Sequence, residues 1–197
     1  MTGWLDLPWA DLPASVRVDV LGILAYRKPA IRIPLGDHTV AERVAAVITE
    51  VGWSHASDEE YLVAAPLPEV ALHILDVDRR TEHHTLELGL LLGYPLCCAR
   101  AAATAGEEDI DRLAARLGAN CDRAGAPQLD PRDYPSGIAL VSYIACSPRC
   151  PSALRDARAA IGCIDTAIPE VDMSTEPWRT WGQAARTLRT RTTGGAS

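Results

Sequence analysis

Two short stretches of this chain place a proline two residues before a cysteine, and they carry its most specific chemistry. YPLCC spans residues 94–98 and SPRC spans residues 147–150, with Cys146 directly before the second stretch. Each stretch predicts a helix start, because proline suits the first helical position, and Cys97 and Cys150 would then both occupy the third position. The free N–H groups and the positive end of the helix dipole at such a place favour thiolate over thiol. Two helix starts of this kind are suited to hold a soft cation or an anionic cluster.

The spacing of the four cysteines, C-C-x47-C-x3-C, matches neither the paired C-x2-C knuckles of a zinc ribbon nor the ferredoxin run. Cysteine sulfur selects zinc, Cu(I) or iron–sulfur centres over magnesium or calcium. Two adjacent cysteines are easier to place on different irons of a cluster than on one ion, and Pro151 after Cys150 resembles the Cys-Pro of bacterial ferredoxin motifs. We therefore predict a [4Fe–4S] cluster, with zinc as the alternative cofactor, held by Cys98, Cys146, Cys150 and either Cys97 or Cys121.

The order G-Y-P-x-C-C followed by C-S-x-x-C resembles the signature of a poorly characterised prokaryotic domain family. The resemblance covers roughly residues 86–153, and its matching positions are Gly93, Tyr94, Pro95, Cys97, Cys98, Cys146, Ser147 and Cys150. It implies metal binding and supplies no reaction. Ile144 and Ala145 stand where the family usually has His and Pro, so no histidine role carries over to this chain.

Composition and charge narrow the classes of protein that this chain can belong to. Hydrophobic residues make up 48% of the chain and charged residues 23%, as in ordinary globular proteins, and the net charge of −7 disfavours a nucleic-acid partner. The N-terminus lacks a signal-peptide pattern, and the longest apolar run is too short to span a membrane. We therefore expect a cytoplasmic protein whose six thiols stay reduced, and the excess of arginine over its single lysine, Lys28, indicates a bacterial source.

The first eighty residues predict a small α+β layer in the order β-β-α-β-β. Two short strands fit within residues 16–34, a capped helix with a valine stripe fits 37–52, and two more strands fit 60–66 and 69–77. The second half is mainly helical, with a buried strand expected at 137–145 and Cys121 expected in a polar loop over 118–137. We predict helices over residues 81–93, 95–104, 107–118, 152–168 and 176–191. The domain organisation is then 1–80, a helical metal-binding subdomain over 81–191 and a disordered tail over 192–197.

Catalytic candidates lie beside the first cysteine motif. His83 and Glu87 are spaced i,i+4 and would share one helix face, and Tyr94 adjoins the thiols. With three thiols on a cluster, an open iron could act on a small-molecule substrate as a Lewis acid, in sulfur transfer or in redox chemistry. A small enzyme of bacterial specialised metabolism, acting on such a substrate or with a pathway protein, is the leading hypothesis.

Two alternatives stay open. The first is a structural zinc or interaction module in which the four thiols fix two helix starts. The second is a metal-free thiol oxidoreductase that uses the adjacent pair Cys97 and Cys98. Cys163 is expected to pack in the core, because it lies on the apolar side of its helix. The sequence leaves the oligomeric state open.

Overall fold

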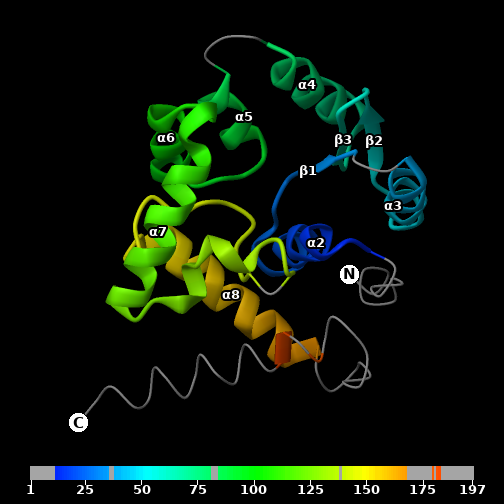
Figure 1. Ribbon diagram of the computed structural model, residues 1–197. Helices are drawn as coiled ribbons and strands as arrows, with labels where there is room; N and C mark the ends of the chain where they lie inside the picture. The colour runs from blue at the N-terminus through cyan, green and yellow to red at the C-terminus, as the bar shows by residue number, and fades with distance from the viewer. Residues whose placement is uncertain are drawn as a thin grey trace.

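The computed structural model describes residues 12–35, 38–80, 84–137, 139–167, 179 and 181–182 of the chain. Within these residues it holds one three-stranded antiparallel sheet and seven α-helices, so the predicted α+β class is confirmed (Figure 1). The elements in chain order are α2 (Ala14–Tyr26), β1 (Ile31–Pro34), α3 (His38–Glu50), β2 (Ser54–Ser57), β3 (Tyr61–Ala65), α4 (Pro68–Asp78), α5 (Thr85–Leu91), α6 (Leu96–Ala105), α7 (Ile110–Ala124) and α8 (Pro151–Ala167). Short 3-10 turns follow as η2 (Glu107–Asp109), η3 (Pro127–Leu129) and η4 (Pro131–Asp133).

The predicted order β-β-α-β-β is wrong in two places, where segments expected to be strands are helices. The first is α2, a run rich in valine and leucine that is buried over most of its length. A fully buried segment does not reveal its period, so its β-branched residues misleadingly indicated a strand. The second is α4, which Pro68 opens at the first helical position. The strand β2 was missed because its sequence, SHAS, is short and polar.

The sheet has the order β1-β3-β2, with both pairs antiparallel, so β3 is its central strand. Successive side chains of β3 alternate between two faces, as they must in a strand. Leu62 and Ala64 join the larger core with α2, α3 and α8, whereas Val63 and Ala65 join the smaller core with α4 and α5. The sheet is therefore covered by helices on both faces.

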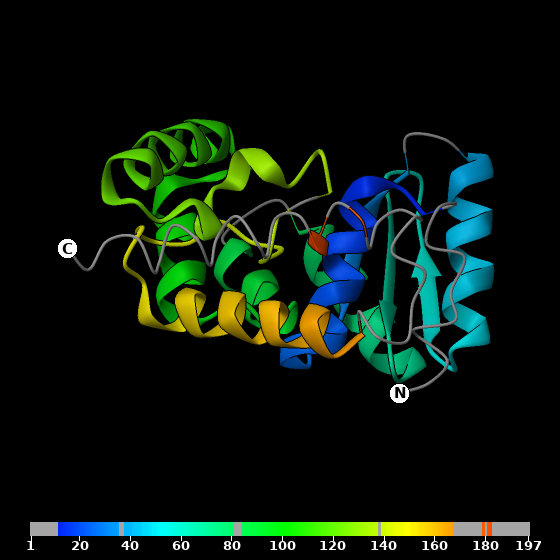
Figure 2. The same ribbon diagram turned by 90° about the horizontal axis from the view of Figure 1, so that it is seen from below.

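Helix α2 links the sheet to the C-terminal helices. Figures 1 and 2 show it in the middle of the molecule, with the sheet on one side and α7 and α8 on the other, and it packs across α8. Residues from the first thirty and from the last third of the chain therefore share one hydrophobic core. This packing brings the segment after α2 close to the cysteine-bearing segments described below.

Helix α7 runs longer than the sequence predicted, because it continues past residue 118 to Ala124 and ends at Gly125, which has φ +64°. Leu113, Leu117 and Cys121 recur every four residues on its buried face. The expectation that Cys121 lies in a polar loop was therefore wrong.

The apolar segment before the second cysteine motif is neither the predicted strand nor a helix. Residues 139–146 form a series of bends whose side chains are mostly buried. The Ser142 N–H donates to the Tyr26 hydroxyl over 3.3 Å, and the Tyr143 hydroxyl donates to Asp156 over 2.7 Å, so side chains bind this segment to its surroundings. The predicted helix over 176–191 lies largely outside the described residues, and the tail over 192–197 lies wholly outside them. Trp181 is described and fully buried, and its Nε1 donates to the Gly137 carbonyl over 2.8 Å.

Candidate metal centre

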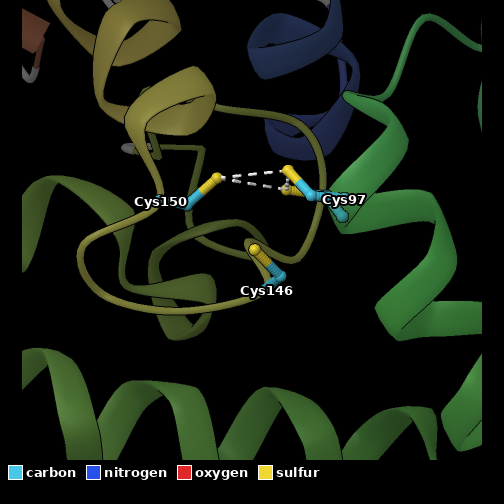
Figure 3. A group of neighbouring side chains, drawn as sticks. Cys97, Cys146 and Cys150 are labelled. Carbon is cyan, nitrogen blue, oxygen red and sulfur yellow. Dashed lines mark hydrogen bonds between the residues drawn. The ribbon is translucent and has the colours of Figure 1, made fainter.

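Four cysteines from three segments meet at one place in the structure. The sulfur atoms of Cys97, Cys98, Cys146 and Cys150 all lie within 4.8 Å of one another. Three Sγ–Sγ distances are 3.9 Å for Cys97–Cys98, 3.6 Å for Cys97–Cys150 and 3.7 Å for Cys98–Cys150. Figure 3 shows Cys97 and Cys150 pointing toward each other from two helix starts, while Cys146 approaches from the loop between them. The predicted grouping of these four thiols is confirmed.

The two helix starts differ in detail from the prediction. Pro95 has extended backbone angles and precedes α6 as its N-cap, so Cys97 and Cys98 occupy the second and third helical positions. At the other start, Pro151 is the first helical residue and Cys150 precedes it. The Cys150 carbonyl accepts the first helical hydrogen bond, from the Leu154 N–H at 2.9 Å. The expectation that Cys97 and Cys150 share the third helical position was wrong. Pro95 lies one position before its helix, as the N-cap, and Pro151 rather than Pro148 is the first residue of α8.

The four thiols differ in burial, so one side of the site lies in the core and the other faces solvent. Cys98 and Cys150 are each 1% exposed and belong to the main hydrophobic core, whereas Cys146 is half-buried and Cys97 is exposed. Two ligands thus anchor the site in the core while one faces solvent. An ion can enter from the side of Cys97.

The environment separates the acidities of the thiols. Burial alone would raise the pKa of Cys150, but the backbone N–H of Ala153 and the neighbouring thiols bring this pKa below its usual value. Burial raises the pKa of Cys98 well above its usual range, and burial together with Cys150 raises the pKa of Cys146 to about 11. Among Cys98, Cys146 and Cys150, the environment therefore favours deprotonation of Cys150 over the other two. A cation is needed to stabilise the further thiolates.

The residues ahead of the first cysteine pair have structural reasons for their identity. Gly93 has φ +79°, and a Cβ built on it would lie 2.3 Å from the Cδ atom of Pro29, so only glycine fits. The Tyr94 ring packs against the Tyr143 ring, with centroids 5.3 Å apart, and the Lys28 Nζ lies 5.7 Å from its centroid. The segment after α2 is thereby seated on the start of α6.

A buried polar network continues from this contact. Lys28 forms an ion pair with Asp19 and donates to the Ser142 Oγ over 2.8 Å, and the Tyr134 hydroxyl donates to Asp19 over 2.8 Å. The Tyr26 hydroxyl lies 3.4 Å from the Ser142 Oγ. Burial raises the pKa values of Tyr26 and Tyr134 above their usual range. The sequence analysis did not predict this network. The one signal for it is that the chain has a single lysine, Lys28, in an otherwise arginine-rich sequence.

The other predicted site residues lie away from the tetrad or outside the described part of the chain. Cys121 is fully buried on α7 within the core, where burial raises its pKa to about 11, and it does not belong to the four-cysteine group. Glu87 is exposed on α5 and pairs with Arg80 over 2.8 Å. His83 lies outside the described residues. Cys163 is half-buried on α8 and packs against the core, as predicted.

Fold and site together define an α+β protein that carries a four-cysteine candidate metal centre at the starts of α6 and α8. No family model matches the chain, and the searches of curated proteins and of solved structures returned no match either. Among the described residues, none of the helices combines the length and the apolar character that crossing a bilayer requires.

Proposed function

We propose that Cys97, Cys98, Cys146 and Cys150 bind one tetrahedral metal ion, and that this ion is zinc. A Zn–S bond of about 2.3 Å in a tetrahedron separates its sulfur ligands by about 3.8 Å. The three Sγ–Sγ distances of 3.9, 3.6 and 3.7 Å match this separation, and this observation carries the proposal. Cys146 completes the tetrahedron with a small inward shift, because it lies within 4.8 Å of the others.

A fully occupied set of four thiolates leaves no open position for a substrate, so a structural role is favoured over Lewis-acid catalysis. The ion would tie the start of α6, the loop at Cys146 and the start of α8 to one point. Because the unfolded chain has no preformed site, the free energy of binding the ion adds to the stability of the folded protein. The proposed function is therefore a zinc-stabilised protein module.

A [4Fe–4S] cluster remains the second candidate, favoured by the Cys150-Pro151 pair and by the adjacent cysteines at the start of α6. In such a cluster each cysteine binds a different iron, so its sulfur atoms stand farther apart than the ligands of one ion. Binding a cluster would require the tetrad to expand.

Metal analysis of protein purified without oxygen distinguishes the candidates. We expect one zinc per chain, no visible absorption, and tetrahedral sulfur-ligand spectra when cobalt replaces zinc. Four irons and four sulfides per chain with a brown colour would instead support the cluster and contradict the zinc proposal. A folded protein that binds neither metal would contradict both and favour the thiol oxidoreductase.

Cysteine variants connect the metal to the tetrad. Cys150→Ser should bind zinc about 10-fold more weakly or worse, because it removes a buried ligand whose sulfur lies close to those of both Cys97 and Cys98. Cys163→Ser is the matched control, since Cys163 lies on the same helix and outside the tetrad. Equal zinc content and affinity in the two variants would refute the assignment of ligands.

A further inference from the structure

Two of the three cysteine-bearing segments have a tyrosine three residues ahead of a cysteine. Tyr94 precedes Cys97 at the start of α6, and Tyr143 precedes Cys146 in the loop before α8. Their rings meet at a centroid distance of 5.3 Å and an interplanar angle of 37°. These two segments are thus in direct aromatic contact just ahead of their cysteines.

Tyr143 also ties the third ligand-bearing segment to this pair. Its hydroxyl donates to the Asp156 Oδ2 over 2.7 Å, and Asp156 lies on α8, which begins directly after Cys150. Asp156 is only 5% exposed, and Arg155 pairs with its other oxygen over 3.1 Å. The starts of α6 and α8 and the loop at Cys146 are therefore connected by one ring contact and one buried hydrogen bond.

We propose that Tyr94 and Tyr143 are positioning residues that hold the four thiols together before any metal arrives. The two tyrosines serve the metal site proposed above, so their biological role rests on that proposed function. With the segments already fixed, binding an ion does not have to order three loops, so the affinity for the ion rises. Neither tyrosine touches the ion; each acts through the segment that carries a ligand.

The two tyrosines contribute in different ways. One hydrogen bond joins the Tyr143 hydroxyl to Asp156. Among the described residues, the Tyr94 hydroxyl has no hydrogen-bond partner. Tyr94 therefore acts through its ring, between Lys28 and Tyr143. A phenylalanine should replace Tyr94 without loss, while the same change at Tyr143 removes the bond to α8. If the Tyr94 hydroxyl were catalytic, Tyr94→Phe would instead lose function.

The metal-free protein tests the proposal independently of the ion. Diamide oxidises two neighbouring thiols to a disulfide and is itself reduced to the hydrazine, and peptide mapping then measures how fast Cys97 and Cys150 become linked. We expect the rate to fall at least about 5-fold in Tyr94→Leu and Tyr143→Phe and to stay at the wild-type value in Tyr94→Phe. If Tyr94→Leu and Tyr143→Phe both formed the Cys97–Cys150 disulfide at the wild-type rate, the proposal would be overturned. The result stands even if the wild type binds no zinc, which would refute only the proposed function.

Metal affinity and the cobalt spectrum give the second readout. Tyr94→Leu and Tyr143→Phe should weaken zinc binding about 10-fold in competition with a chelator, the range typical of supporting residues around a metal site. Their cobalt spectra should broaden or shift as the tetrahedron loosens, and Tyr94→Phe should restore both properties. Tyr26→Phe is the control, because it perturbs the buried network at Ser142 without touching a cysteine-bearing helix start. A loss of affinity in Tyr26→Phe equal to that in Tyr94→Leu would assign the effect to general stability.

Discussion

Replacing Lys28 with methionine tests how strongly the buried ion pair with Asp19 stabilises the fold. The side chains of Lys28 and Asp19 are 2% and 3% exposed, so the change leaves a carboxylate inside the protein, and among the described residues its remaining side-chain donor is the Tyr134 hydroxyl. Removing one partner of such a pair costs about 3–5 kcal/mol. Folded domains have a total stability of about 5–15 kcal/mol, so the variant should retain a small fraction of it or unfold.

Urea denaturation of the metal-loaded protein measures this loss. With a slope of about 2 kcal/mol per molar urea, a cost of about 4 kcal/mol lowers the midpoint by about 2 M. The double variant Asp19→Asn, Lys28→Met removes both charges, so it should be more stable than the sum of the single changes predicts. If the double variant lost as much stability as the two single variants together, Lys28 and Asp19 would not depend on each other.

An exposed pair supplies the matched control for this experiment. Arg79 and Asp58 lie 3.1 Å apart, but the Arg79 side chain is 58% exposed. Arg79→Met should cost less than about 1 kcal/mol, because water screens exposed ion pairs. A cost for Lys28→Met no larger than that of the control would contradict the reasoning from burial.

Two further predictions concern backbone geometry and pH. Gly93→Ala should destabilise the fold by more than Gly52→Ala when both are measured in urea, because both residues have φ +79° but only Gly93 would place a Cβ against Pro29. Equal costs would contradict the proposed contact between Gly93 and Pro29. Burial raises the pKa of Cys121 from about 9 to about 11, so its neutral thiol stabilises the fold fully below about pH 8 and progressively less as the pH rises through 11. The stability difference between the wild type and Cys121→Ala should therefore shrink between pH 7 and pH 11, and a constant difference would refute it.

Local patterns accounted for elements whose periodicity is plain in the sequence. The valine stripe and the stop at Gly52 predicted α3, the short apolar run within residues 60–66 predicted β3, and the long amphipathic segment after Pro151 predicted α8. They failed for α4, whose valine and isoleucine residues favour a strand although its buried residues Ala71, Ile74 and Leu75 follow helical spacing. They failed for α2 and the segment over 139–146, because a largely buried run of apolar residues has the same composition in a helix, a strand or an irregular segment. Burial on several sides removes the polar face that would have revealed the period.

The repeated Pro-x-Cys pattern was enough to mark Cys98, Cys146 and Cys150 as candidate ligands, but it left the fourth open between Cys97 and Cys121. The folded structure places Cys97, and not Cys121, with the other three. Cys121 lies apart from the group on the buried face of α7, and Lys28 was brought over the Tyr94 ring by the packing of α2 in the core. The physical reason is that these contacts join residues that are far apart in the chain, and no local spacing records which distant faces will meet.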